Sequence, residues 1–360
     1  MADRPNVLVV GAGIIGASIA YHLAKVGARV TILDAGEPGG VATRNSWAWI
    51  NASWGNPEAY FRLRIRSMAE WRRLESEIPS LEVAWLGGLI WDIPPDELEA
   101  YAKEHASWGY GIRRVDRAAA ARIEPQLRNP PDFALHVAEE GSIEPLAAAQ
   151  AFLEAAQALG AKLIANRPVR QLACDNRRVV GVETEAGTIE ADEIVVAAGA
   201  GTAKLAASAG HALPLDTPPG LLIASRPHPK LLNGLVMSPG LHVRQTKEGR
   251  LLAGADFGGS DPGADATATS LDLFEVMRGM FKNGSALEYA YHTVGYRPMP
   301  GDGFPIVGRP PKIDGLYLAV LHSGITLAPA VGLFAAEEIV GGARNNLLKL
   351  YGPGRFAGSN

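Results

Sequence analysis

The chain opens with apolar runs that flank an amphipathic stretch. Residues 6–10 (NVLVV) are apolar and largely β-branched, which is typical of a strand buried on both faces of a parallel sheet. Ile15, Ile19 and Leu23 then follow helical spacing, and residues 28–33 (ARVTIL) form a second apolar run. This succession predicts a strand, a helix and a parallel strand at the start of an α/β domain.

The remaining chain repeats both kinds of pattern. Helical periodicity covers residues 57–77 and 144–159. Residues 86–93 and 242–255 are the clearest strands of the second part, and 242–255 is expected to be a hairpin that turns at Lys247-Glu248-Gly249. Residues 193–202 (EIVVAAGAGT) are an apolar run that leads into small residues. We therefore expect a parallel sheet combined with a second, antiparallel part.

Two long uncharged runs have the length of membrane spans. The first, 7–24, contains glycines at defined spacing, and the second, 316–336, has His322, Ser323 and Pro329 in its middle. Polar and helix-breaking residues at these positions are unfavourable in a spanning helix. Each run is better explained as a strand, a turn and a buried helix, so we expect no transmembrane segment.

The composition is that of a globular chain without a strong electrostatic preference. Of 360 residues, 47% are hydrophobic and 20% are charged, and the net charge is −4. This balance argues against disorder and gives no basis for binding nucleic acid. Cys174, the one cysteine in the sequence, excludes an internal disulfide and a cysteine cluster for zinc, and its strand-like surroundings predict a small buried hydrophobe. We expect a cytoplasmic protein without a metal site.

A glycine-rich turn joins the first predicted strand to the first predicted helix. In its sequence, GAGIIG, Gly11 makes the tight turn, Gly13 admits a pyrophosphate and Gly16 allows the helix to pack closely on the strand. The helix N-terminus offers N–H groups and a positive dipole end to the phosphates. Asp34, at the end of the second strand, is placed to accept hydrogen bonds from a ribose. These features predict a dinucleotide-binding domain.

The residues after Asp34 favour FAD over NAD. An NAD dehydrogenase would continue with strands and helices in alternation, whereas residues 35–46 (AGEPGGVATRNS) form a loop of small and hydrogen-bonding residues. Here the sequence resembles the glycine oxidase/D-amino-acid oxidase superfamily of flavoenzymes, in five blocks over nearly the whole chain. The blocks are GAGIIG with its acid, GVATRNSWAWIN, ANRPVRQL, EIVVAAGAGT, and the pair GYRPMPGDGFPIVG and LYLAVLHSGITLAPAVG.

The resemblance implies an FAD that is bound non-covalently, because the cysteine that attaches flavin in monomeric sarcosine oxidases has no counterpart here. It implies that the helix starting near Gly324 points its dipole at the flavin, with backbone and side-chain donors there. The cofactor-binding residues it implies are Gly11, Gly13, Ile14, Ile15, Gly16, Asp34, Ala35, Thr43, Arg44, Asn45, Ser46, Val169, Ala198, Gly199, Gly324, Ile325 and Thr326.

The resemblance also implies the domain organisation. Residues 1–80, 140–215 and 290–360 are expected to form a discontinuous, Rossmann-like FAD-binding domain of the glutathione-reductase-like type. Residues 81–139 and 216–289 are expected to form a substrate domain, an α+β unit with an antiparallel sheet above the flavin.

Three residues are candidates for substrate chemistry. Arg297 matches the arginine that binds the substrate carboxylate in glycine oxidase-like enzymes, a task that suits its planar fork; the alternative is a loop arginine paired with Asp302 or Glu288. His322 falls where some members carry a second carboxylate-binding arginine, and it could hydrogen-bond a carboxylate, accept a proton or only pack beside the flavin. His242 falls where the family often has a tyrosine, with a purely structural role as its alternative.

Trp47, Trp49 and Asn51 are further candidates for the cavity wall, although tryptophans more often belong to the core. Together these features predict an FAD-dependent oxidoreductase that oxidises the C–N bond of a small amino acid or secondary amine to an imine, with a hydride passing to flavin N5. The alternatives are oxidation of a hydroxy acid, an FAD-carrying subunit of a heteromeric dehydrogenase, and an NAD-dependent dehydrogenase. The electron acceptor, O2 or a redox partner, and homo- or hetero-oligomerisation stay open.

Overall fold

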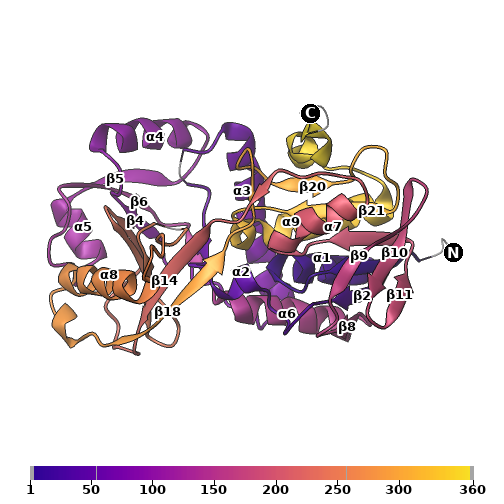
Figure 1. The fold of residues 1–360 in the computed structure, drawn as a ribbon. Helices are drawn as coiled ribbons and strands as arrows, with labels where there is room; N and C mark the ends of the chain where they lie inside the picture. The colour runs from indigo at the N-terminus through magenta and orange to yellow at the C-terminus, as the bar shows by residue number, and fades with distance from the viewer. Residues whose placement is uncertain (1–3, 54, 257, 357–360) are drawn as a thin grey trace.

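The computed structural model describes residues 4–53, 55–256 and 258–356. Residues 1–3, 54, 257 and 357–360, which fall in the expected domain ranges, lie outside the described residues. The described residues form two lobes (Figure 1), one around a six-stranded sheet and one around an eight-stranded sheet. This arrangement confirms the expected α/β domain with a second, antiparallel unit.

The six-stranded sheet is parallel except for its edge strand β20. In spatial order its strands are β20 (Ile306–Gly308), β21 (Leu316–Val320), β12 (Glu193–Val196), β1 (Asn6–Val10), β2 (Arg29–Leu33) and β8 (Lys162–Ile164). Side chains of β1 alternate between two cores: Val7 and Val9 pack with the helices, while Leu8 and Val10 face a small three-stranded sheet. Burial on both faces explains the unbroken apolar run.

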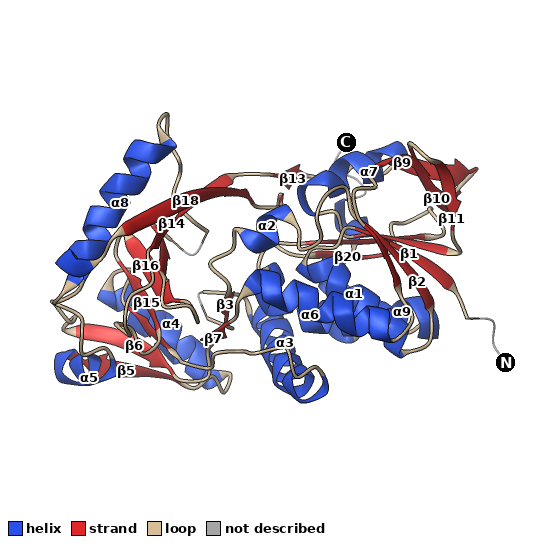
Figure 2. Cartoon of the chain, turned by 90° about the horizontal axis from the view of Figure 1, so that it is seen from below, coloured by secondary structure: helices blue, strands red, loops and turns tan. Residues whose placement is uncertain are grey.

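Helices cover one face of this sheet and a small β-sheet covers the other (Figure 2). The helical side consists of α1 (Ile14–Lys25), α3 (Glu58–Glu77), α6 (Pro145–Ala158) and α9 (Gly324–Gly341). The other side consists of β9 (Val169–Asp175), β10 (Arg178–Thr184), β11 (Gly187–Glu190) and α7 (Thr202–Ser208). The helices expected over 57–77 and 144–159 are confirmed. Cys174, however, is exposed on β9, so its expected burial is wrong.

Helix α9 is long and apolar enough to cross a membrane, but 72% of it is buried inside this molecule, against α1 and α3. Pro329 lies inside the helix and cannot donate to the carbonyl of Ile325. The indole of Trp71 on α3 donates to that carbonyl at 3.0 Å instead, so the interruption is satisfied by the neighbouring helix. Gly332 allows α1 to approach, since a Cβ there would lie 2.3 Å from Ser18 Oγ. The start of α9 is therefore held firmly in place.

The second lobe is antiparallel apart from the parallel pair β15 and β4. In spatial order its strands are β18 (Tyr289–Tyr296), β14 (Pro219–Ser225), β17 (Leu251–Gly254), β16 (Leu241–Gln245), β15 (Leu235–Ser238), β4 (Gly88–Ile90), β6 (Phe133–Val137) and β5 (Ile112–Asp116). Its helices are α4 (Pro95–Ser107), α5 (Arg117–Ile123) and α8 (Ala266–Met280). The predicted hairpin is β16 and β17.

Two expectations for this lobe need correction. The strand expected over 86–93 is limited to β4. β18 pairs along its length with β14, so the expected domain boundary at residue 290 falls inside a strand of the eight-stranded sheet. Short ribbons join the lobes: β3 (Trp49–Ile50) pairs with β7 (Gly141–Ser142), and β13 (Leu215–Asp216) pairs with β19 (Met299–Pro300).

Candidate active site

A cavity of about 1050 Å³ lies between the lobes, lined by residues of the β1–α1 turn, the β14 and β18 strands and the start of α9. Most small-molecule sites have volumes of roughly 300–1000 Å³, so this one has room for a dinucleotide and a small substrate. All expected cofactor-binding residues except Gly16 line it: Gly11, Gly13, Ile14, Ile15, Asp34, Ala35, Thr43, Arg44, Asn45, Ser46, Val169, Ala198, Gly199, Gly324, Ile325 and Thr326.

The glycine-rich turn is built for close backbone approach. Gly11 has a φ of 106°, and a Cβ on it would lie 2.4 Å from the carbonyl oxygen of Ala197, at the end of β12. Gly16 lies behind the cavity, where a Cβ would meet the carbonyl oxygen of Gly11 at 1.9 Å. Gly16 therefore serves the tight packing of helix on strand, as its position in the motif predicts.

Asp34 connects the end of β2 to this turn. Its Oδ2 accepts a hydrogen bond from the backbone N–H of Ala12 at 2.7 Å, and Oδ1 accepts one from Gly36 at 2.9 Å. A carboxylate offers about four lone-pair sites, so both oxygens keep acceptor capacity for the hydroxyls of a ribose. The carboxylate both fixes the turn and faces the cavity.

The loop after Asp34 is held by its own side chains. Thr43, in the short helix α2 (Val41–Arg44), accepts a hydrogen bond from Ile14 N–H at 3.1 Å and so caps the start of α1. Arg44 donates from Nε to the carbonyl of Gly40 at 3.1 Å, and Asn45 donates to the carbonyl of Val41 at 2.9 Å. A fixed loop of backbone donors beside a helix N-terminus fits the phosphates of a dinucleotide.

The start of α9 forms the opposite wall. Ser323 has a φ of 58° and the helix begins at Gly324, directly after the turn. Thr326 donates its hydroxyl proton to the carbonyl of Trp49 at 2.9 Å and accepts from Asn51 N–H at 3.3 Å. The expectation that the Thr326 side chain donates to the flavin is therefore wrong, because its proton is already used. The backbone of this turn and the hydroxyl of Ser323 line the cavity.

Arg297 follows β18 and reaches into the cavity. Its Nε is buried without a hydrogen-bond partner among the described residues, and its Nη2 lies 3.5 Å from the carbonyl oxygen of Pro219. The alternative partners are engaged elsewhere, since Asp302 pairs with Arg355 and Glu288 pairs with Arg226. Within the described residues, no carboxylate pairs with Arg297, so the guanidinium is available to an anionic ligand.

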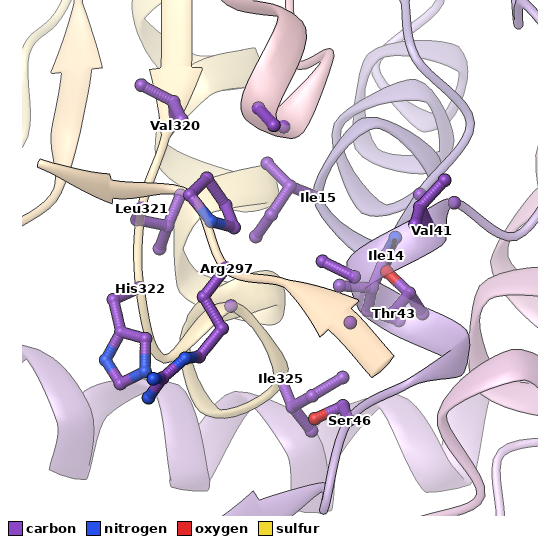
Figure 3. A pocket seen from close by; sticks show the side chains of 18 of the residues that line it. Ile14, Ile15, Val41, Thr43, Ser46, Arg297, Val320, Leu321, His322 and Ile325 are labelled. Carbon is purple, nitrogen blue, oxygen red and sulfur yellow. Dashed lines mark hydrogen bonds between the residues drawn. The ribbon is translucent and has the colours of Figure 1, made fainter. Parts of the chain in front are cut away.

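His322 lies two residues after the end of β21 and extends towards the same side of the cavity as Arg297 (Figure 3). Burial, with the positive charges of Arg297 and Arg64, lowers the pKa of His322 to about 4. The imidazole is therefore neutral at neutral pH. It can exchange hydrogen bonds with a ligand, but it adds no positive charge.

His242 is placed differently from the expectation. It is buried on β16, its Nε2 lies 3.0 Å from Oδ2 of Asp92, and it does not line the cavity. Its ring centroid lies 6.0 Å from that of Trp47, which does line the cavity together with Trp49 and Asn51. His242 supports the wall from behind, which corrects the catalytic role expected for it.

Arg64 is a functional candidate that the sequence analysis missed. It lies on α3, is 5% exposed and lines the cavity. Its Nε and Nη2 donate to the backbone and side-chain oxygens of Asn51 at 3.0 and 2.6 Å. The sequence contained one indication of its burial: Arg64 lies four residues from Tyr60 and from Met68, on the apolar face of the predicted helix.

Comparison with known proteins agrees with this geometry. The profile of the DAO family, described as FAD dependent oxidoreductase, matches residues 6–338. A glycine oxidase of Bacillus licheniformis is 27% identical over 352 residues, which cover 95% of this chain and 94% of that protein. A hydrogen cyanide synthase subunit of Pseudomonas aeruginosa is 26% identical over 382 residues, covering 91% and 90%. Among solved structures, an L-proline dehydrogenase from P. horikoshii is similar with a TM-score of 0.90, 25% identity and 100% coverage of both chains.

Proposed function

The chain belongs to the DAO family of FAD-dependent oxidoreductases, and on this premise we propose that it oxidises the C–N bond of a small amino acid or secondary amine whose carboxylate binds Arg297. The observation that carries the proposal is the Arg297 guanidinium, which faces the cavity without a carboxylate partner among the described residues. FAD, when bound, supplies the acceptor for a hydride from the carbon next to nitrogen. Hydrolysis of the resulting imine by water completes the reaction.

The protein side chains orient the substrate and set the protonation of its amine. The planar fork of Arg297 suits two parallel hydrogen bonds to a carboxylate. The positive charges of Arg297 and Arg64 disfavour an ammonium ion in the same cavity, which lowers the pKa of the bound amine. With a pKa of about 4, His322 is a poor acceptor for the amine proton. Against an α-amino pKa of about 8, that transfer would cost about 5 kcal/mol. We therefore propose that His322 forms a hydrogen bond to the substrate and that the proton of the substrate amine is released to solvent.

FAD is held without a covalent bond in this proposal. Cys174 is exposed on β9 and does not line the cavity, so the chain offers no thiol to the flavin there. Acid precipitation should therefore release the flavin into the supernatant, and a flavin retained in the pellet would contradict this part.

A second candidate is that the chain acts as the FAD-carrying subunit of a heteromeric enzyme. The name of the Pseudomonas aeruginosa relative, a subunit of hydrogen cyanide synthase, supports this candidate. Turnover by the purified chain alone with an artificial electron acceptor would favour independent action. Flavin reduction that is followed by no turnover with O2 or dyes would favour the subunit.

Anaerobic titration of the flavoprotein tests the main proposal. The panel contains glycine, sarcosine, proline, D- and L-amino acids and a hydroxy acid, with flavin absorbance as the readout. We expect bleaching by an amine that carries a carboxylate, and a much higher KM in Arg297→Gln. Bleaching by the hydroxy acid alone, or an unchanged KM in the variant, would refute the proposal.

A further inference from the structure

The part of the cavity lined by Arg297 and His322 is called the substrate end below. It contains a second arginine, Arg64, that forms no ion pair with an acidic residue among the described residues. The hydrogen bonds of Arg64 to described residues go to the oxygens of Asn51. Its Cζ lies 5.3 Å from the centroid of the Tyr60 ring, which is a favourable contact but carries no charge. Uncharged partners orient the guanidinium without neutralising it.

Nearby carboxyl groups supply only part of the missing negative charge. Of the described residues that line the cavity, Asp34 and Glu37 are acidic, and Asp34 is held at the glycine-rich turn by Ala12 and Gly36. Glu140 is fully buried and already accepts hydrogen bonds from Ser53, Tyr110 and Trp49. Burial raises the pKa of Glu140 to about 7, although the positive charge of Arg64 is among the influences that lower it. Glu140 is therefore only partly ionised at neutral pH, and it offsets the charge of Arg64 only in that fraction.

Both arginines act on one point of the cavity. Arg64, Arg297 and His322 all line the cavity, and His322 lies beside the start of α9. Burial, and after it the positive charges of Arg297 and Arg64, lower the pKa of the His322 imidazole. Leaving a cation in a buried or partly buried place without a full counter-ion is costly. This applies to Arg64, which is buried, and to Arg297, which is partly buried. A monocarboxylate would neutralise one of them. A ligand with two carboxylates would neutralise both.

We propose that the substrate is an amine that carries two carboxylates, one bound by Arg297 and the other by Arg64. This inference rests on the proposed function and extends it, because it assigns the second end of the substrate. Secondary amines with a carboxylate on both nitrogen substituents and amino acids with an acidic side chain share this chemistry. The competing explanation is that Arg64 only braces Asn51, and that explanation gives no preference between one carboxylate and two.

The experiment compares matched ligands on the flavin-loaded enzyme. Glutarate is butyrate with a second carboxylate at the end of its chain. Neither ligand is an amine, so neither can reduce the flavin, and their binding is read from the change that they cause in the flavin spectrum. Iminodiacetate and sarcosine are the corresponding secondary amines, read by anaerobic flavin reduction, and glutamate against norvaline tests the amino acid form. The variants are Arg64→Gln and Arg64→Lys, with Arg62→Gln as control, since Arg62 lies on the same helix, is exposed and pairs with Glu58.

We expect the wild-type enzyme to bind glutarate at least about tenfold more tightly than butyrate, in line with one additional charge-assisted interaction. Arg64→Gln should reduce this preference at least about fivefold, Arg64→Lys should retain part of it, and Arg62→Gln should retain all of it. Equal binding of both ligands by the wild type, or an equal loss of both in Arg64→Gln, would overturn the dicarboxylate proposal. Reduction by sarcosine would then still support the proposed function. If no amine reduces the flavin, the proposed function fails, while the spectral titration still decides the role of Arg64.

Discussion

A substitution of Gly258 provides a direct test of the position of Arg297. A Cβ on Gly258 would lie 1.6 Å from Nη1 and 2.7 Å from Cζ of Arg297. Ordinary contact begins near 3.4 Å, so Nη1 has to move by about 1.8 Å in Gly258→Ala. Because the guanidinium is the end of a flexible side chain, it should move while the backbone stays in place.

The magnitude follows from the interactions that this shift removes. A displacement of this size separates the fork from a carboxylate that has to receive two parallel hydrogen bonds. Losing one hydrogen bond to a charged group costs about 1.5–3 kcal/mol. That energy corresponds to a loss of about 10- to 150-fold in kcat/KM. Since no backbone atom of the core is displaced, Tm should change by less than about 4 °C.

The assay is steady-state and anaerobic kinetics with an amine that reduces the wild-type flavin. Gly279→Ala is the matched control, because nothing lies within 4 Å of a Cβ at Gly279 in α8. We expect normal flavin content in both variants and a raised KM only in Gly258→Ala. An unchanged kcat/KM in Gly258→Ala with full flavin content would show that the carboxylate does not bind where Arg297 now lies.

Three further predictions concern the cofactor cradle and pH. Gly11→Ala should abolish FAD binding, measured as flavin content, because the new Cβ clashes with Ala197. Gly187→Ala is the control and should retain FAD: its φ is almost identical (107° against 106°), but nothing lies within 4 Å of its Cβ. Thr43→Val removes the cap of α1 and should lower stability by about 1 kcal/mol in chemical denaturation, with weaker FAD binding in titrations of the apoprotein. Burial raises the pKa of Glu140 from 4.5 to about 7, so the native state binds more protons than the unfolded state between these values and stability should fall as pH rises through them. Glu140→Gln should flatten this dependence in thermal melts from pH 4.5 to 8; an unchanged slope contradicts the assignment.

The cofactor end of the cavity was predictable because it depends on contiguous sequence. A strand, the GAGIIG turn and a helix follow one another without interruption, and Asp34 lies at the end of the next strand. Backbone groups make this part of the site, and only glycine fits at positions such as Gly11 and Gly16. Steric requirements of this kind appear directly in the sequence.

The substrate end was only partly predictable because it is assembled by packing between distant segments. Arg64 lies on a helix, where a long charged side chain would ordinarily extend to solvent. Its burial depends on how α3 packs in the folded molecule. His242 was a candidate because the family often has a tyrosine at this position, but a resemblance in sequence does not tell which neighbour a buried side chain meets. The side-chain proton of Thr326 is likewise taken by Trp49, a partner far away in the sequence.

The fold separates the parts of the site that bind cofactor from those that select substrate. Trp71 and Ser67 of α3 hydrogen-bond to Ile325 and Ala330 of α9, so one helix–helix contact fixes the turn at Gly324 and carries Arg64 to its position near His322. The turn after β1, helices α1 and α2 and the backbone at the start of α9 line the cofactor part of the cavity, and none of them carries Arg64, Arg297 or His322. Changes at Arg64, Arg297 or His322 should therefore alter the choice of substrate while the protein keeps its flavin content. Titration of each variant with flavin and with amine measures the two properties independently.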